Sequence, residues 1–169
     1  AIWRYARSVA YSNKGNIESA QKERQMIDSL KDTNDVLHLD SIYYPASMLL
    51  EIADSLALGE IAISNNDYQS AIQYFANAVS VQDALPYTEP PFWYYPTRLS
   101  LGKAYLLSDQ ADEAEVVFEE NLKRYPRNGW ALYGLIQALE TQNKDSSMVQ
   151  KQFDIIWQNA DVELTSSRF

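Results

Sequence analysis

Side chains that could carry acid-base, nucleophilic or metal chemistry are scattered along this chain rather than grouped. His38 is the single histidine and the sequence has no cysteine, so no His/Cys set can share a metal ion. No G-x-S-x-G or G-x-G-x-x-G pattern occurs, and the five glycines form no phosphate loop. The carboxylates Asp112, Glu113 and Glu115 fall on the outer face of an expected amphipathic helix, where water solvates them. The sequence therefore predicts no catalytic residue, no cofactor, no metal and no enzymatic activity.

Residues suited to ring stacking are concentrated in one stretch of the sequence, residues 87–98, YTEPPFWYYPTR. This stretch contains five aromatic residues, three prolines and an arginine. Two interpretations stay open. In the favoured one, Phe92, Trp93 and one tyrosine plug a helical stack by burying their rings. In the other, Trp93, Tyr94 and Arg98 stay partly exposed at the edge of a groove and stack on a partner. The two roles are compatible if some rings are buried and others presented.

The charge balance excludes one class of partner. The chain carries 14 Lys and Arg against 23 Asp and Glu, a net charge of -9, which argues against binding a nucleic-acid backbone. Residues 1–31 contain six basic and three acidic side chains, so this segment is +3 and the remainder -12. The positive segment could dock on an acidic surface, although a solvated face of scattered charge is the favoured reading.

No apolar run approaches the roughly 18 residues of a membrane span. The sequence also has no N-x-S/T acceptor and no leader pattern. These absences fit a bacterial chain without establishing one, and we expect a soluble protein of the bacterial cytoplasm or periplasm. With 46% apolar residues, the chain has enough material for a core that needs no disulfide or metal.

An internal repeat organises the elements. Residues 55–79 and 98–126 each contain Leu-Gly, a small residue 12 positions after the glycine and a phenylalanine 16 positions after it. The matching residues are Gly59, Ala71 and Phe75 in the first copy and Gly102, Ala114 and Phe118 in the second. Apolar residues recur at three- and four-residue intervals in both. This pattern predicts two antiparallel helices joined by a polar turn, with small residues at the contact and a ring above them.

These residues resemble the tetratricopeptide repeat, a helix-turn-helix unit of about 34 residues. A weaker copy follows at 128–157, where Trp130, Tyr133 and Gly134 fit the opening. A degenerate copy begins the chain, with Ser8 in place of the glycine and Arg24 in place of the phenylalanine. The resemblance implies an all-α superhelix of four antiparallel helix pairs with long inter-repeat loops. The expected pairs are about 1–31, 45–81, 95–125 and 128–158, in a single domain 1–160 with a tail 161–169.

The chain begins inside a helical pattern, so we expect a fragment of a longer polypeptide. The whole stretch resembles the C-terminal repeat domain of a bacterial tetratricopeptide-repeat family whose longer members carry more repeats upstream. That resemblance implies no activity. The carboxylate clamp by which some repeats hold chaperone tails is absent, because its positions are occupied by Tyr5, Val9, Ala57, Pro96 and Ser100.

Two departures from the repeat need an explanation. Gly59 and Gly102 are 43 positions apart, nine more than the period of about 34, and the surplus is the connection 82–95. A second interruption, KDTNDVLHLDSIYY, covers 31–44. The helix after Pro45 should be about two turns longer than the helix after Pro96, leaving an overhang of Met48, Leu49 and Ile52. The aromatic stretch is the expected cover for it.

The leading hypothesis is a non-enzymatic scaffold that binds a peptide or helical protein segment in a concave groove. The partner-binding residues expected from the helix register and the aromatic stretch are Tyr5, Leu56, Glu60, Trp93, Tyr94, Arg98, Leu99, Lys103 and Leu106. The alternative is an accessory domain that positions another part of a larger bacterial enzyme or secretion-related protein, with the upstream part of its own chain as partner. A third possibility is a small-ligand or glycan site on the aromatic stretch.

Overall fold

The computed structural model describes residues 1–168, which form nine α-helices and no β-strand. The chain divides into two compact units, residues 1–97 and residues from 98 onward. Each unit is described by itself. The all-α helical-repeat fold predicted from the sequence is confirmed.

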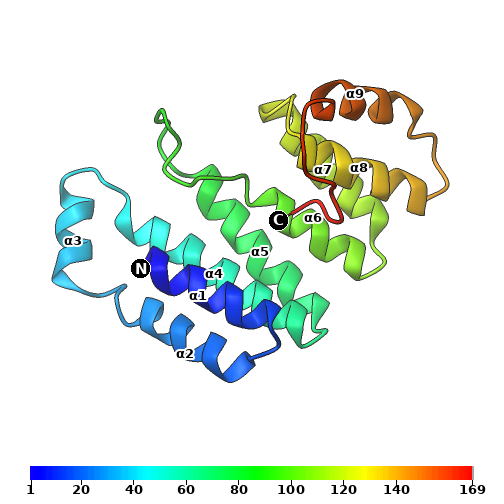
Figure 1. The fold of residues 1–169 in the computed structure, drawn as a ribbon. Coiled ribbons are helices and arrows are strands. Elements are labelled where there is room, and N and C mark those ends of the chain that lie inside the picture. Colours follow the sequence, from blue (N-terminus) through cyan, green and yellow to red (C-terminus); the bar gives the residue numbers. More distant parts are fainter. Residues whose placement is uncertain (169) are drawn as a thin grey trace. The chain divides into compact units, whose positions relative to one another are not determined.

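The first unit contains two helical hairpins and one additional short helix (Figure 1). The first hairpin is α1 (Ile2–Asn13) with α2 (Ile17–Asp28), and the second is α4 (Ala46–Ser64) with α5 (Tyr68–Asp83). The short helix α3 (Asn34–Ser41) lies between the hairpins in sequence and packs against α4. Helix α4 also contacts both α1 and α2, so it is the central element of this unit.

Both hairpins turn in the same way. Gly15 and Asn66 take left-handed backbone conformations, with φ of 71° and 58°. The next residue then caps the second helix: the Asn16 side chain accepts a hydrogen bond from the Ser19 amide, and Asp67 accepts one from the Ser70 amide. A short polar side chain that accepts from a free helical amide is the preferred way to start a helix. The structure thus assigns the cap of α5 to Asp67.

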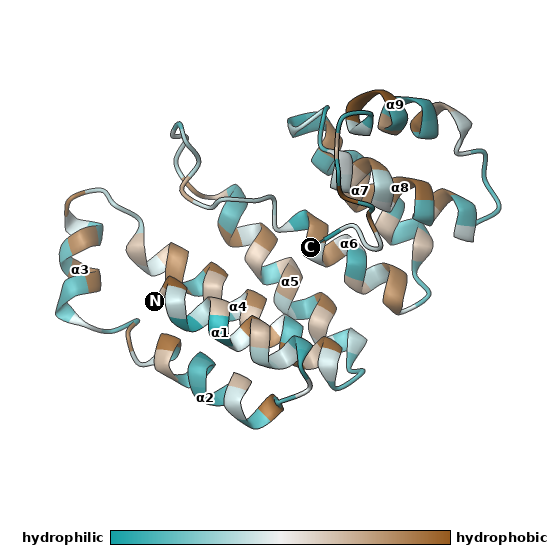
Figure 2. Ribbon diagram, viewed as in Figure 1, coloured by the Kyte–Doolittle hydropathy of each residue, from teal (hydrophilic) through white to brown (hydrophobic). Residues whose placement is uncertain are grey.

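Helix α4 is buried along most of its length, which agrees with its apolar composition (Figure 2). It has 19 residues, whereas α6 (Arg98–Leu107) has 10, so α4 is longer by nine residues, and a difference of about two turns was expected. Among the residues expected in the extra turns, Ile52 is fully buried and Leu49 is half-buried.

The second unit contains α6, α7 (Ala111–Arg124), α8 (Gly129–Thr141) and α9 (Ser147–Trp157). Phe118 of α7 is fully buried and faces two helix backbones at once, at Gly102 of α6 and Gly134 of α8. Helix α9 has no buried residue and packs its rings at the surface, where Phe153 stacks on Trp157 with centroids 5.6 Å apart. Beyond α9 the chain is irregular up to residue 168.

Along residues 1–168, four helical hairpins follow one another, namely α1 with α2, α4 with α5, α6 with α7 and α8 with α9. Helix α6 begins at Arg98, two residues after the proline that was expected in its first turn. The interruption 31–44, expected as a connection, contains the helix α3. Helix α3 has only eight residues, and Val36 is its single buried residue. So short a segment shows no repeated apolar spacing from which a helix could be predicted.

Candidate functional site

Residues 87–97 of the aromatic stretch belong to the first unit, where they form the end of the loop after α5, and Arg98 begins α6 in the second unit. The side-chain amide of Gln82, on α5, binds this part of the loop through both its nitrogen and its oxygen. Its Nε2 donates to the Tyr95 carbonyl at 2.9 Å, and its Oε1 accepts from the backbone amide and the hydroxyl of Thr97, both at 2.8 Å. One side chain thus satisfies three polar groups of a loop that has no regular hydrogen bonding of its own.

Two rings of this loop are buried in the first unit. Trp93 is 3% exposed and packs edge-on against Tyr5 of α1, with ring centroids 5.5 Å apart. Tyr95 is 6% exposed, and its hydroxyl lies 3.3 Å from the Tyr5 hydroxyl. The plug interpretation therefore describes Trp93 and Tyr95. Tyr94 and Tyr87, at 62% and 86% exposure, are presented to solvent instead.

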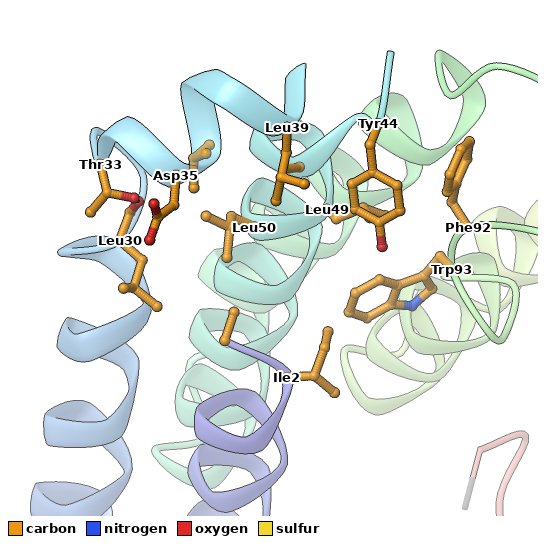
Figure 3. Close-up of a pocket in the computed structure, with 13 residues that line it drawn as sticks. Ile2, Leu30, Thr33, Asp35, Leu39, Tyr44, Leu49, Leu50, Phe92 and Trp93 are labelled. Carbon is orange, nitrogen blue, oxygen red and sulfur yellow. The ribbon is translucent and has the colours of Figure 1, made fainter. Parts of the chain in front are cut away.

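Phe92 and Trp93 also form one wall of an apolar pocket of about 300 Å³, here called the α3 pocket. Its other walls come from α3, from the first turns of α1 and α4, and from the segment around Leu30. Figure 3 shows Tyr44, Phe92 and Trp93 on one side of this pocket and Leu30, Thr33 and Asp35 on the other. Further apolar lining residues are Ile2, Val36, Leu39, Ala46, Leu49 and Leu50.

The α3 pocket has few polar groups. The Thr33 hydroxyl donates to the Leu30 carbonyl at 2.9 Å, so its proton is already used. The Asp35 carboxylate has no hydrogen-bond or ion-pair partner among residues 1–168, and Asp35 is the only residue with a charged side chain in the lining. No lysine, arginine or histidine lines the pocket. The lining also includes Ala1, the Tyr44 hydroxyl and the Trp93 indole N–H, which is buried without a hydrogen-bond partner in the described part of the chain, and the rest of the cavity is apolar.

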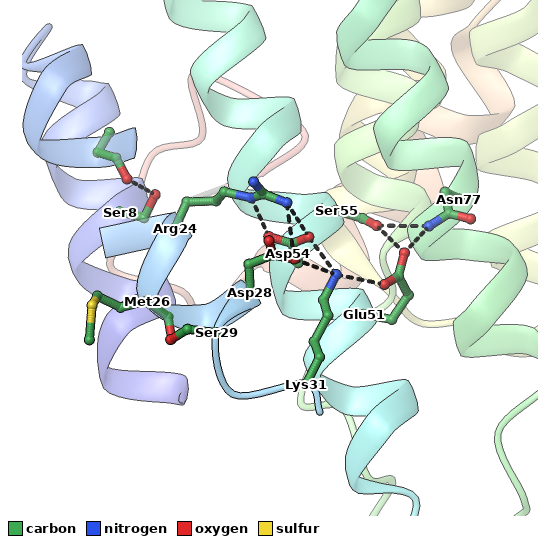
Figure 4. A network of polar contacts seen from close by, with 11 residues as sticks. Ser8, Arg24, Met26, Asp28, Ser29, Lys31, Glu51, Asp54, Ser55 and Asn77 are labelled. Carbon is green, nitrogen blue, oxygen red and sulfur yellow. Dashed lines mark hydrogen bonds and ion pairs between the residues drawn. The ribbon is translucent and has the colours of Figure 1, made fainter. Parts of the chain in front are cut away.

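A second cluster, the Asp54 network, joins α2, α4 and α5 (Figure 4). Asp54 is buried and accepts from Arg24 Nε and Nη2, at 2.5 and 2.8 Å, and from Lys31 Nζ at 2.7 Å. Lys31 also donates to Glu51 at 2.9 Å, and Glu51 accepts from Asn77 at 2.8 Å. Arg24 stands where the repeat would have a phenylalanine, so an ion pair with the next hairpin replaces ring packing at this position.

The electrostatics of the Asp54 network hold its charges in place. The hydrogen bond to Asp54 raises the pKa of Arg24 above its usual value despite partial burial. Burial alone would lower the pKa of Lys31, but its hydrogen bonds to Asp54 and Glu51 outweigh this and raise it. Arg24 and Lys31 therefore stay positively charged at neutral pH, and their hydrogen bonds to Asp54 link α2 and the turn after it to α4.

Internal pairing also uses much of the positive charge of residues 1–31. Arg4 and Arg7 of α1 donate to the two carboxylate oxygens of Glu23, at 2.8 and 2.7 Å. The hydrogen bond from Arg4, with the help of Arg7, lowers the pKa of Glu23 against the opposing effect of burial. With Arg24 and Lys31 paired as well, four of the six basic side chains of this segment have partners inside the first unit. Carboxylates of the first unit therefore neutralise most of the positive charge of residues 1–31.

The partner-binding residues expected from the sequence differ in their exposure. The buried ones are Tyr5, Leu56, Glu60, Trp93 and Leu99. In this structure their side chains pack inside the protein and are not accessible to a partner. Tyr94 is exposed in the first unit, whereas Arg98, Lys103 and Leu106 are half-buried on α6 in the second. The structure brings Tyr5, Trp93 and Tyr94 together, with 5.5 Å between the Trp93 and Tyr94 ring centroids.

Sequence reasoning did not anticipate the α3 pocket. Asp35, Leu39 and Tyr44 lie in the first interruption of the repeat, and Phe92 lies in the second. Tyr44 and Phe92, the nearest of these across the two interruptions, are 48 positions apart in the sequence. The Tyr44 and Phe92 rings nevertheless meet edge to face, with centroids 5.5 Å apart. The one signal was the doubled pattern of two tyrosines before a proline, at 43–45 and 94–96.

Residues 1–168 contain no cluster of three or more His, Cys, Asp or Glu side chains that could hold a metal ion. Within the same residues, every helix is too short or too polar to cross a membrane.

Antiparallel helical hairpins that stack through small residues and one buried ring define a helical-repeat protein. A comparison with protein families gives this class a name, because residues 56–84 match the model of the tetratricopeptide repeat. The match covers the end of α4, the capped turn and α5, and it identifies this hairpin as a tetratricopeptide repeat. Such repeats generally mediate protein-protein interactions. A comparison with curated proteins finds no match to the chain.

Proposed function

We propose that this protein is a non-enzymatic scaffold that binds a peptide or helical segment of a protein partner through the exposed rings of its aromatic loop. The observation that carries this proposal is the division of one loop into buried and exposed rings. Trp93 and Tyr95 anchor the loop, and Tyr94 and Tyr87 face the solvent beside them. Tyrosine is enriched at interfaces because its large ring brings little conformational entropy to be lost.

The exposed residues of the expected groove extend this proposal to the second unit. Arg98, Lys103 and Leu106 lie on α6 and keep part of their side chains accessible. These three side chains on α6 would suit contact with a segment that has both apolar and acidic side chains.

The proposal is tested by placing a photo-crosslinking phenylalanine analogue at position 94 and expressing the protein in its native host. We expect a specific protein to crosslink at position 94 and to be absent when the analogue replaces Val116, which is 58% exposed on α7. The Tyr94→Ala/Arg98→Ala variant should then lose most of its affinity for that protein. Equal crosslinking at both positions, or unchanged affinity of the double variant, would contradict the proposal.

A specific observation favours the alternative of a positioning domain. Matching Ser8 with Gly59 places Ile2, Trp3, Ala6 and Ala10 of α1 at the positions of Ala53, Asp54, Ala57 and Ile61 of α4. All four α4 residues are buried, and Asp54 faces α2 of the preceding hairpin. All four α1 residues are exposed, with Trp3 at 68%. Another helical hairpin stacked on α1 would cover them, and crosslinking from position 3 to such a hairpin would support this alternative.

A further inference from the structure

We propose that the α3 pocket receives one large apolar side chain from a protein segment that carries lysine or arginine next to it. This inference rests on the proposed function, since it takes the partner to be a protein. It names a second contact site and the chemistry of the segment that fits there.

Both departures from the repeat contribute walls to the α3 pocket. The interruption 31–44 supplies α3 and Tyr44, and the aromatic loop supplies Phe92 and Trp93 (Figure 3). The repeated hairpins alone would leave the overhanging first turns of α4 open at this point. The pocket is therefore a feature added to the repeat by two separate insertions.

The size of the α3 pocket suits a side chain rather than a packing defect. Protein interiors contain few voids larger than one water molecule, whereas pockets that bind small molecules have volumes of about 300–1,000 Å³. The volume here is about 300 Å³. Moving a phenylalanine or leucine side chain from water into such a cavity is favourable, because the lining offers apolar contacts.

The floor of the α3 pocket is rigidly held and its mouth is accessible. Trp93, Leu50 and Val36 are buried, and Trp93 is held by the edge-on contact with Tyr5. Ile2 is 54% exposed and Tyr44 is 45% exposed. A preformed floor lowers the cost of binding, because few side chains have to be ordered when the guest enters.

Charge selects the neighbours of the entering side chain. Asp35 is exposed, unpaired within residues 1–168, and the only charged side chain in the lining. A lysine or arginine beside the apolar side chain can donate to this carboxylate, whereas an acidic neighbour would be repelled. The net charge of -9 favours the same kind of partner at longer range.

The first experiment uses three short capped peptides in a Gly/Ser background, with central Lys-Phe-Lys, Glu-Phe-Glu or Lys-Ala-Lys. Binding is followed by NMR through the Trp93 indole and the backbone amides of Val36 and Leu39. We expect Lys-Phe-Lys to shift these signals saturably and the other two peptides to bind about tenfold more weakly or less. Equal binding of the phenylalanine-free peptide would overturn the apolar part of the proposal. Equal binding of the acidic peptide would overturn the cationic part.

Variants then locate the contact. Asp35→Asn should weaken the Lys-Phe-Lys peptide about two- to fivefold, the effect of losing one accessible ion pair. Asp32→Asn is the matched control, since it removes an exposed acidic charge three positions earlier that does not line the pocket. Equal effects of the two variants would reduce the interaction to nonspecific attraction. Leu39→Phe should narrow the pocket and weaken binding while the circular dichroism spectrum stays that of the parent.

Other occupants give different results. Shifts of the pocket signals with protein concentration alone would identify a second copy of this chain and overturn the proposal. If the Leu39→Phe variant still binds the protein captured at position 94 as tightly as the parent does, this inference fails and the proposed function stands. If the parent captures no protein at all, the proposed function fails, whatever the peptides do.

Discussion

Gly59 of α4 lies directly against the ring of Phe75 of α5, so closely that a β-carbon on Gly59 would stand 2.2 Å from Phe75 Cε1. Phe75 is itself 1% exposed and has no solvent-facing space into which it could move. The glycine of the repeat is therefore required by the close approach of the ring. The same relationship recurs in the second unit, where Phe118 lies against Gly102 and Gly134.

Adding a single methyl group at this contact should destabilise the first unit. We expect Gly59→Ala to lower the free energy of unfolding by about 1–3 kcal/mol, because the ring must leave its preferred position. Urea unfolding measures the change. Phe75→Leu provides the test of mechanism. In the double variant the smaller side chain relieves the clash, so the double variant should lose less unfolding free energy than the two single variants lose together. A Gly59→Ala midpoint equal to that of the parent would contradict the assigned contact.

The buried and exposed rings of the aromatic loop should respond differently to truncation. Trp93→Ala should cost about 3–5 kcal/mol of unfolding free energy, because it leaves a cavity beside Tyr5. Tyr94→Ala, at 62% exposure, should change it by no more than about 0.5 kcal/mol. Iodide quenching gives an independent reading, since Trp3 should be quenched readily and Trp93 protected. A readily quenched Trp93 would show that the loop does not act as a plug in solution.

The ion pair that replaces a ring in the first repeat should behave as a coupled unit. Arg24→Met should destabilise the protein by about 2–4 kcal/mol, since Asp54 stays buried with one cation fewer. Asp54→Leu alone should also destabilise it, because Arg24 and Lys31 lose their shared acceptor. The double variant should lose less than the sum of the two, because it leaves neither group of the pair unmatched. Strict additivity would mean that the pair contributes no coupling energy.

Acid should weaken the first hairpin through Glu23. Its pKa is lowered in the folded protein, chiefly by the hydrogen bond from Arg4. The resulting stabilisation is therefore fully present above the ordinary pKa of 4.5 and is lost as the pH falls through the lower folded value. We expect Glu23→Gln to be less stable than the parent near neutral pH and to differ much less at about pH 3. Glu18→Gln, at an exposed position on the same helix, is the matched control for the loss of one carboxylate, and both variants are compared with the parent by urea unfolding.

The local parts of this fold could be read from the sequence, because they depend on contacts between near neighbours. The spacing from Gly59 to Phe75 predicted a hairpin with a polar turn, and α4 and α5 form one. Helix α3 escaped prediction because only Val36 of its residues is buried, so it has no apolar stripe. Its position depends on packing against α4, a contact that local patterns do not encode.

The candidate site was predicted less well, for a different physical reason. The helix register placed Tyr5 on an open concave surface, as an ideal superhelix would. Trp93, 88 positions later, covers it, and a contact at that separation is set by the whole fold. The α3 pocket arises in the same way, from two interruptions whose meeting could not be derived from either one alone.

The single glutamine that holds the end of the aromatic loop has a practical consequence for protein engineering. Gln82 and the buried Trp93 and Tyr95 keep the loop anchored from Trp93 to Thr97, whereas the tip from Pro86 to Pro91 is mostly exposed and has no comparable tie. Extra chain is tolerated best where few backbone contacts are lost. An epitope tag or a small reporter domain could therefore be spliced in near Glu89, giving a labelled protein that keeps both its repeat and its plug.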